Sequence, residues 1–480
     1  MKKHKRSTFS GKLGFVLSAA GASVGLGNIW RFPYLAAKYG GGIFLLVYIM
    51  LALTFGYTLI MAETSLGRMT RKSPVGAFES FGNSRFISIG GWINAIIPIL
   101  IVPYYSVIGG WVIKYLIEYF AGHSKTLAGD AYFTTFISNG WSTEICFIIF
   151  TLFTLGIIYA GVRNGIERVS KFMMPILIVL SLIIAVYSVT RPGAIEGVKY
   201  FLVPNFDHFS WMTVVSAMGQ MFYSLSIAMG ILITFGSYMK KDTSIEKSTE
   251  NVEIFDTAIA IMAGLMIIPA VFAFSGGNAE TLKSGPALMF ITIPKVFANM
   301  GFGTAIGVVF FLLVLFAAVT SSIALTESAV STFEDELHWS RKKSTVFMGM
   351  VMLLLGTLSC LGYGPLANFK ILGMQFLDFF DFITNSVMMP IAAIATCLLV
   401  SKVVGVDKIE EEITKDGQAF RRKKIFCFMI KYLCPLFSSD HFDQLSCKCF
   451  WNYHNVISYM CTTIKRMADF SAILFYMIIL

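Results

Sequence analysis

Ten long apolar runs, separated by short loops, dominate this sequence of 480 residues. A helix needs about 20 apolar residues to cross the hydrocarbon core of a bilayer, and the runs have about that length or more. They lie at 13–37, 42–65, 86–120, 144–160, 166–190, 211–238, 254–274, 302–331, 344–362 and 372–401. Charged residues make up 14% of the chain, about half the share that coats a soluble domain. The pattern predicts an all-α polytopic membrane protein and excludes a transmembrane β-barrel, whose strands give short alternating segments.

The basic residues collect in alternate loops, and this asymmetry predicts an orientation. With the N-terminus in the cytoplasm, the inside loops contain Lys2, Lys3, Lys5, Arg6, Arg68, Arg71, Lys72, Arg163, Arg168, Lys171, Lys240, Lys241, Lys247, Arg341, Lys342 and Lys343. The outside loops then contain only Lys125, Arg191, Lys199, Lys283, Lys295 and Lys370. Cytoplasmic loops of membrane proteins are enriched in Lys and Arg. We therefore expect a multi-pass protein of the cytoplasmic membrane, and the net charge of +10 indicates a lipid bilayer rather than nucleic acid as partner.

Two of the runs contain residues that disfavour helix at mid-membrane. The first run has glycine, serine and asparagine between Gly21 and Asn28, and the sixth has Ser224-Leu-Ser-Ile-Ala-Met-Gly230. Such residues weaken the helical state and offer competing hydrogen bonds. A broken helix in lipid is tolerated only where its freed backbone groups face protein, ions or substrate. The breaks lie five spans apart, as in transporters with two inverted five-helix repeats. The alternative is that the small residues only allow close packing between helices.

Several motifs resemble those of the neurotransmitter:sodium symporter family. They are Gly25-Leu-Gly-Asn-Ile-Trp-Arg-Phe-Pro-Tyr34, Gly40-Gly-Gly42, Glu63-Thr-Ser-Leu-Gly67, Gly219-Gln-Met-Phe-Tyr-Ser-Leu-Ser226, Ala317-Ala-Val-Thr-Ser-Ser322 and Phe333-Glu-Asp-Glu-Leu337. The resemblance covers about residues 6–430. It implies a leucine-transporter-type fold with a 5+5 inverted repeat and broken helices 1 and 6. The implied divisions are a cytoplasmic N-terminal segment, a first repeat, a second repeat and a C-terminal segment, at 1–12, 13–190, 211–401 and 402–480.

The resemblance implies sodium-coupled import of a small amino acid or amine by alternating access, without enzymatic chemistry or an organic cofactor. Family members that carry amines lacking a carboxylate have aspartate at the position of Gly25, so we expect an amino acid as substrate. A carboxylate is costly at mid-bilayer. Backbone N–H groups of the unwound first helix, at the positive end of its second half, can offset that cost. The resemblance assigns the substrate pocket to Ser23, Gly25, Leu26, Gly27, Tyr105, Tyr223, Ser226, Met229, Ser322 and Leu325.

The predicted pocket gives a first indication of specificity. By resemblance, Tyr105 hydrogen-bonds the substrate carboxylate and Tyr223 closes over the substrate. The remaining walls are mostly apolar, which indicates a small hydrophobic or aromatic amino acid. A single methylene changes selectivity by only about 1–3 kcal/mol, so the walls define a class of substrate rather than one compound.

The resemblance also implies two sodium ions, bound by oxygen ligands that carry little net charge. One site takes the Ser23 carbonyl, the Asn28 side chain, Ser224 and the substrate carboxylate. The other takes the carbonyls of Gly21, Val24 and Ala317 and the hydroxyls of Thr320 and Ser321. The alternative for these hydroxyls is hydrogen bonding to carbonyls of their own helix. Because sodium and substrate meet in the first site, each is expected to favour binding of the other.

Asp256, in the seventh span, departs from the family pattern. Many members have asparagine there, and animal members bind chloride close by. We expect the Asp256 carboxylate to supply the negative charge in place of chloride. The alternative is that Asp256 lies near the cytoplasmic end and pairs with Lys240, Lys241 or Lys247.

Charges near the two ends of the predicted pathway indicate gates. On the outer side, Arg31 and Asp381 are expected to pair. On the inner side, the resemblance assigns the gate to Arg6 and Asp335, with two aromatic residues beside them, Phe9 and Tyr238. Exposed ion pairs are worth about 0–1 kcal/mol, which suits contacts that form and break in every cycle. The alternative for Arg6 is extension to lipid headgroups.

After about residue 430 the sequence no longer resembles the family, and the eleventh helix is expected to be truncated or divergent. Five of the eight cysteines lie in this region, at Cys427, Cys434, Cys447, Cys449 and Cys461. Their spacing indicates neither a disulfide framework nor a metal site. The alternative function is a non-transporting amino-acid sensor of the same fold, and a homodimer is compatible with either function.

Overall fold

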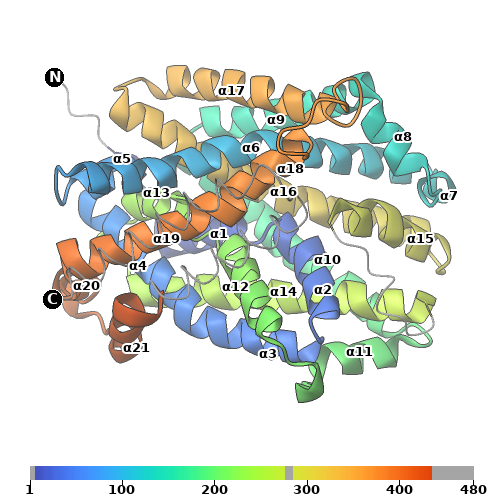
Figure 1. Cartoon of the computed structure of the whole chain (residues 1–480), viewed down its shortest axis with the longest axis horizontal. Coiled ribbons are helices and arrows are strands. Elements are labelled where there is room, and N and C mark those ends of the chain that lie inside the picture. Colours follow the sequence, from blue (N-terminus) through green and yellow to red (C-terminus); the bar gives the residue numbers. More distant parts are fainter. Residues whose placement is uncertain (1–5, 276–284, 435–480) are drawn as a thin grey trace.

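The computed structural model describes residues 6–275 and 285–434, which form helices joined by short loops (Figure 1). Within these ranges, eight helical spans are long and apolar enough to cross a membrane. They are Gly42–Thr70, Arg85–Phe120, Gly140–Tyr159, Val162–Val189, Ile245–Ser275, Gly303–Glu336, Arg341–Leu361 and Phe376–Val404. A ninth span is the pair Lys12–Ser23 and Gly27–Lys38, whose halves bend by 51°.

The individual helices keep the order of the apolar runs. The first half of the chain forms α1 (Lys12–Ser23), α2 (Phe32–Lys38), α3 (Gly42–Leu51), α4 (Tyr57–Thr70), α5 (Pro74–Glu79), α6 (Arg85–Phe120), α7 (Ser124–Leu127), α8 (Tyr132–Ser138), α9 (Gly140–Tyr159), α10 (Arg168–Val189) and α11 (Ala194–Leu202). The second half forms α12 (Trp211–Ser224), α13 (Ile231–Tyr238), α14 (Ile245–Ser275), α15 (Ile293–Ala298), α16 (Gly303–Glu336), α17 (Arg341–Leu361), α18 (Phe376–Asp381), α19 (Met389–Leu398), α20 (Val406–Ile413) and α21 (Lys423–Phe428). Wider π-helical turns lie at Gly27–Arg31, Ala52–Gly56, Val162–Glu167, Leu288–Thr292, Phe382–Met388, Leu399–Val404 and Met429–Leu433.

The first and sixth runs are broken, as predicted. The first helix ends at Ser23, passes through Val24 in extended conformation and resumes at Gly27. The sixth ends at Ser224 and resumes at Ile231. In this second gap, Ser226 and Ala228 have φ angles of 54° and 59°, which are unfavourable for residues with a side chain. Backbone strain of this kind persists where neighbouring groups hold the segment, often at functional sites.

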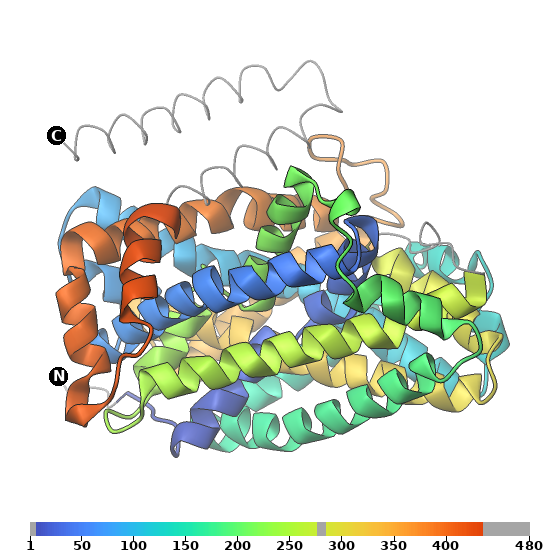
Figure 2. The same cartoon turned by 90° about the horizontal axis from the view of Figure 1, so that it is seen from below.

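The broken helices lie in the middle of the helical bundle (Figure 1). α1 packs against α10, α14 and α16, whereas α12 packs against α3 and α13 against α4. Figure 2 shows α14 running between the α3–α4 span and α10. The core therefore surrounds the two segments that have lost their helical hydrogen bonds.

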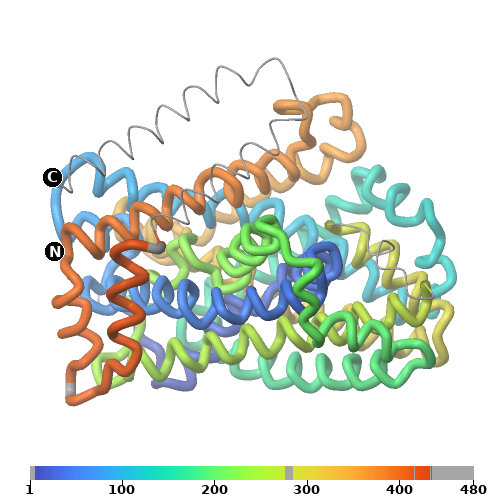
Figure 3. The backbone as a smooth tube through the Cα atoms, turned by 60° about the horizontal axis from the view of Figure 1, so that its bottom comes forward, coloured from blue at the N-terminus to red at the C-terminus, as the bar shows by residue number. Residues whose placement is uncertain are grey.

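The basic loops meet at one end of the molecule. Lys240 Nζ donates to the Ser10 carbonyl over 2.6 Å, and Arg71 donates to the Ser237 carbonyl over 2.9 Å. Arg341 donates to the Ile158 carbonyl over 2.9 Å. α20 and α21 lie at this same end, beside the start of α1 (Figure 3). The structure thus brings together the loops that the charge pattern assigned to one side of the membrane.

Some boundaries differ from the apolar runs. The helix of the seventh run begins at Ile245 rather than at 254, because its polar first turns continue the helix beyond the apolar stretch. The helix of the second run continues to Thr70. After the tenth span, the described chain forms α20, α21 and a last π-helical turn and ends at Cys434. The described residues do not include the rest of the predicted eleventh helix, nor Cys447, Cys449, Cys461 and Lys283.

Glycines allow α4 and α13 to approach until their backbones touch. A Cβ on Gly67 would lie 2.0 Å from the Ile233 carbonyl oxygen, and a Cβ on Gly236 would lie 2.5 Å from the Thr64 carbonyl oxygen. Small residues at helix contacts are typical of membrane proteins, where close packing replaces the hydrophobic effect between helices. The half-helix α13 is thereby fixed against the second span.

We expect Gly236→Ala to lower the free energy of unfolding by about 1–3 kcal/mol, because the added methyl group must push α13 away from α4. Gly156→Ala on α9 is the matched control, since no described atom lies within 4 Å of the position its Cβ would take. The measurement is the unfolding midpoint of each purified variant in detergent. Equal midpoints for the two variants would contradict backbone contact between α4 and α13.

Candidate substrate and sodium site

A cavity lies where the two broken helices face each other. It is lined by Ala22, Ser23, Gly25, Leu26, Gly27, Asn28, Ile101, Tyr105, Tyr223, Ser226, Met229, Ile231, Ser321 and Leu325. The lining comes from both gaps and from the faces of α6 and α16 turned toward them. None of these described residues is an Asp, Glu, Lys, Arg or His. The cavity therefore offers hydroxyl, amide and backbone groups against an apolar wall.

Two glycines of the first gap allow side chains to approach its backbone. A Cβ on Gly25 would lie 2.6 Å from Ser321 Oγ and 3.1 Å from Tyr105 Oη, and a Cβ on Gly27 would lie 2.4 Å from the Tyr223 ring. The Leu26 N–H donates to Tyr105 Oη over 3.2 Å. Glycine at 25 and 27 is therefore a steric requirement of this site.

Every predicted pocket residue except Ser322 lines the cavity. Ser322 was a wrong assignment, because its Oγ lies 3.2 Å from Thr154 Oγ1 of α9, on another side of α16. Successive helical residues point about 100° apart, so Ser321 faces the cavity and Ser322 does not. The sequence reasoning missed Ala22, Ile101 and Ile231 as lining residues. Ile101 could have been found, since it lies one helical turn before Tyr105.

Hydroxyls of α16 meet the end of α1. Ser321 Oγ donates to the Ala22 carbonyl over 3.1 Å and lies 3.4 Å from that of Gly21. Thr320 Oγ1 donates to the carbonyls of Phe316 and Ala317 over 3.0 and 3.1 Å. The helical back-bonding considered for these hydroxyls is thus present at Thr320, yet a hydroxyl keeps free lone pairs when it donates. The cluster gathers hard, uncharged oxygens around the carbonyls of Gly21, Ala22 and Ala317, whereas no contact of these hydroxyls with the predicted ligand Val24 is seen among the described residues.

Asp256 lies in a separate polar cluster with Asn28 and Ser224, beside the first gap. Its carboxylate is fully buried and accepts hydrogen bonds from Asn28 Nδ2, Ser224 Oγ and Tyr48 Oη, each 2.8 Å long at its shortest. The alternative of a partner among Lys240, Lys241 and Lys247 is wrong for this structure, since none of them forms an ion pair with Asp256 in the described ranges. The neutral donors leave a full negative charge next to Asn28 if the carboxyl is ionised. A buried charge of this kind needs a cation or a proton close by.

The chain was compared with known proteins. The sequence model of the sodium:neurotransmitter symporter family matches residues 6–147 and 137–455. The uncharacterized sodium-dependent transporter YhdH of Bacillus subtilis is 33% identical over 442 residues, which cover 91% of this chain and 97% of the relative. An uncharacterized sodium-dependent transporter of Haemophilus influenzae is 30% identical over 446 residues, covering 90% and 96%. The crystal structure of MhsT in complex with L-phenylalanine matches with a TM-score of 0.83 and 33% identity, covering 92% of this chain and 100% of that one.

This chain belongs to the sodium:neurotransmitter symporter family. It is therefore related to sodium-dependent membrane transporters and not to enzymes. Its fold is the leucine-transporter type, with discontinuous first and sixth helices. The family match reaches residue 455. The similarity to the family therefore continues beyond residue 430, the point after which no family motif was found in the sequence.

On the outer side of the symporter cavity, the expected pair of Arg31 and Asp381 is not formed. No ion pair within 4.0 Å joins these two described residues. The Arg31 guanidinium instead lies 5.2 Å from the centre of the Tyr223 ring, and Asp381 accepts hydrogen bonds from Tyr104 and Asn385. In this conformation, Arg31 therefore contacts the Tyr223 ring and Asp381 contacts neutral side chains, and the outer pair stays a prediction.

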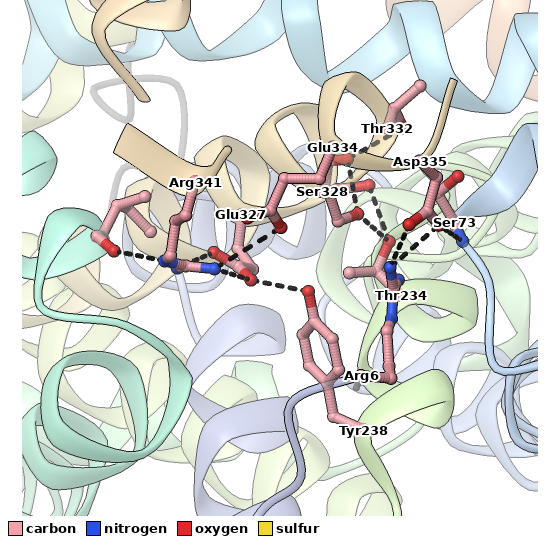
Figure 4. A network of polar contacts seen from close by, with 12 residues as sticks. Arg6, Ser73, Thr234, Tyr238, Glu327, Ser328, Thr332, Glu334, Asp335 and Arg341 are labelled. Atoms are coloured by element: carbon pink, nitrogen blue, oxygen red, sulfur yellow. Dashed lines mark hydrogen bonds and ion pairs between the residues drawn. The ribbon is translucent and has the colours of Figure 1, made fainter. Parts of the chain in front are cut away.

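On the inner side, the structure brings the four predicted gate residues together, and Figure 4 shows three of them, Arg6, Asp335 and Tyr238. Arg6 donates to both oxygens of Asp335 over 2.7 and 2.8 Å and lies 4.9 Å from the centre of the Tyr238 ring. Phe9 packs edge-on against Tyr238, and its N–H donates to the Tyr238 carbonyl. Burial by itself lowers the pKa of the Arg6 guanidinium, but Tyr238 and the carboxylates around it, Asp335 first, outweigh burial and raise this pKa. The Arg6 guanidinium therefore stays charged.

A second inner ion pair was not expected from the sequence. Glu327 is fully buried, accepts a 2.7 Å hydrogen bond from Tyr238 Oη and pairs with Arg341 at 2.5 Å (Figure 4). Glu327 lies eight residues before Asp335 on α16, about two helical turns. That spacing was a signal that both carboxylates face the same side of α16.

Replacing Asp256 by Asn should weaken sodium binding by about tenfold or make it depend on chloride. Asn has one amide oxygen, so its NH₂ group would face hydroxyl donors, and a hydrogen bond to a charged group is worth about 1.5–3 kcal/mol. The measurement is sodium-dependent thermal stabilisation of the purified protein, in chloride and in gluconate. Asp207→Asn, at an exposed loop position, is the control. Unchanged sodium binding without any response to chloride would contradict a role for the Asp256 charge.

Proposed function

We propose that this symporter imports a small hydrophobic or aromatic amino acid together with sodium by alternating access. The observation that carries the proposal is the cavity itself. Unwound backbone and the Tyr105 hydroxyl form one wall, and Ile101, Met229, Ile231 and Leu325 form another. An amino acid has the matching pair of ends, a carboxylate and an apolar side chain. The similar structure of MhsT is a complex with L-phenylalanine, which belongs to this substrate class.

The substrate carboxylate is proposed to bind at the first gap, near Gly25, Leu26 and Gly27. In this region no described lining residue is cationic, so a fixed side-chain charge is not what offsets the carboxylate. The proposed donors are backbone N–H groups of this segment and the Tyr105 hydroxyl, which in this structure accepts from the Leu26 N–H and would turn to the carboxylate when the substrate binds. A bound cation would complete the neutralisation, and this requirement is what couples substrate to sodium.

Two sodium ions are proposed as co-substrates, at the two oxygen clusters described above. The first cluster combines the Ser23 carbonyl, Asn28 and Ser224 with the substrate carboxylate, and Asp256 lies directly behind Asn28 and Ser224. The second combines carbonyls from the end of α1 with hydroxyls of α16, where Ser321 contacts that end. In this scheme Asp256 replaces chloride, since a buried carboxylate already provides the negative charge beside the first ion.

The two gates support a particular stage of the proposed cycle. The inner pair of Arg6 and Asp335 is closed, whereas Arg31 and Asp381 are unpaired across the outer side. This asymmetry is expected for a state that releases nothing to the cytoplasm. We assign residues 13–190 and 211–401 to the two inverted repeats and the basic end to the cytoplasm, which makes the protein an importer of the cell membrane.

The decisive experiment is uptake into proteoliposomes under an inward sodium gradient. Radiolabelled phenylalanine should accumulate above its equilibrium level, and replacing sodium by choline or collapsing the gradient should abolish the accumulation. A panel of unlabelled amino acids then defines the substrate by competition. Sodium-dependent binding without accumulation would refute transport and indicate a sensor of the same fold.

The Tyr105→Phe variant tests the proposed carboxylate site. We expect the affinity for phenylalanine to fall by about tenfold, because a hydrogen bond to a charged group is lost. The affinity for phenethylamine, which lacks the carboxylate, should change much less. Sodium-dependent binding titrations measure both, with Tyr159→Phe, a half-exposed position on α9, as control. Equal losses for the two ligands would show that Tyr105 does not bind the carboxylate.

A further inference from the structure

The cytoplasmic end of α1 meets a carboxylate from another membrane span. Glu167 ends the π-helical turn Val162–Glu167, which leads into α10, and its side chain is only 2% exposed. The Ser10 N–H donates to Glu167 Oε2 over 2.8 Å, and the Ser10 hydroxyl donates to Oε1. Both contacts cross from the segment just before α1 to the fifth membrane span.

The approach of this carboxylate depends on a glycine one turn further along. A Cβ on Gly14 would lie 2.3 Å from Glu167 Oε1 and 2.5 Å from its Cδ. Any larger residue at position 14 would therefore displace the carboxylate. Two lysines complete the contact, since Lys171 Nζ lies 2.6 Å from Glu167 Oε1 and Lys240 Nζ donates to the Ser10 carbonyl over 2.6 Å.

Glu167 brings a negative charge to the start of α1, and it accepts its hydrogen bonds there from Ser10, the residue before the N-cap. The first turn of a helix has free N–H groups and the positive end of the helix dipole, which a nearby anion stabilises. Among the described residues, the N-cap position of α1 is Gly11, which provides no side-chain cap, and its first turn contains no acidic residue. The anion comes instead from Glu167, the residue just before α10, 157 positions after Ser10 in the sequence.

α1 is thus held at both ends by different partners. Its outer end contacts Ser321 of α16 through the carbonyls of Gly21 and Ala22. Its inner end contacts Glu167, about 18 Å away along a helix of 12 residues. The inner contact is separate from the gate of Arg6 and Asp335, because that pair joins the chain to α16 and not to α10.

We propose that Glu167 is a positioning residue that caps α1 from the fifth span and keeps the cytoplasmic side closed until the cap is released. The inference rests on the proposed alternating access, in which the inner end of α1 must leave its neighbours. Releasing the cap separates a buried carboxylate from two donors on Ser10, so it opposes opening. Sodium bound near the outer end of α1 and Glu167 near its inner end then both hold the same half-helix in place.

Hydrogen exchange of the full chain in lipid nanodiscs tests this capping. The variants are Glu167→Gln, which removes the charge, and Gly14→Ala, which displaces the carboxylate without changing any charge. In sodium, both should raise the exchange rate of a peptide covering residues 9–20 by about tenfold, since the contact is a hydrogen bond to a charged group. The controls are Glu196→Gln, whose carboxylate is exposed on α11, and Gly156→Ala. Exchange in α6 and α9 should stay unchanged.

The outcomes separate the cap from the proposed function. Faster exchange of α1 in both variants, with α6 and α9 unaffected, supports the cap even if the wild-type protein accumulates no amino acid. Unchanged α1 exchange in both variants overturns it, even if the wild-type protein transports. Faster exchange spread evenly over α1, α6 and α9 also overturns it, because that result indicates general loosening. If Glu167→Gln does not fold, Gly14→Ala and Ser10→Ala decide the question by the same readout.

Discussion

The fold depends on one constraint, namely that every backbone polar group inside a bilayer needs a partner within the protein. Two spans give up their helical hydrogen bonds, and side chains from other elements replace them. The Ala228 N–H donates to Glu63 over 2.8 Å, and Gln220 donates to the Gly27 carbonyl over 3.0 Å. The Gly25 N–H lies 3.3 Å from Asn28 Oδ1. A few buried polar residues therefore hold the two breaks in place. Glu63 and Gln220, each part of a motif found in the sequence, do so by hydrogen-bonding to the unwound backbone.

The same constraint explains why the site contains so few charges. A site that must release sodium and substrate cannot enclose several fixed charges, because each would cost several kcal/mol when left unpaired. Carbonyls, hydroxyls and one amide supply oxygens at much lower desolvation cost. Asp256 is the exception, and the structure surrounds it with three neutral donors instead of a lysine. A single carboxylate beside neutral ligands leaves one charge for a cation to compensate.

The sequence predicted the spans, both breaks and most of the cavity, because glycine, serine and motif spacing act locally. The prediction from sequence failed where the position of a side chain depends on the rotation of its helix or on contacts between distant parts of the chain. Ser321 and Ser322 are neighbours with the same chemistry, and only the packing of α16 shows which one faces the cavity. Tyr48 lies 208 positions from Asp256, so no local pattern connects them. The charges of Arg31 and Asp381 were visible, but whether a gate is open belongs to the conformation and not to the sequence.

The inner side contains ion pairs of two kinds, and their burial indicates which contacts can break. Arg6 and Asp335, which join the segment before α1 to α16, are 15% and 23% exposed. Water can reach these groups as they separate, so breaking them costs little. Glu327 is fully buried between Arg341 and Tyr238, and removing one partner from a buried charge is expensive. In the proposed alternating access, the segment before α1 can therefore leave α16 more easily than α16 can leave Arg341 at the start of α17. We expect Glu327 and Arg341 to keep α16 and α17 together while the pair of Arg6 and Asp335 separates.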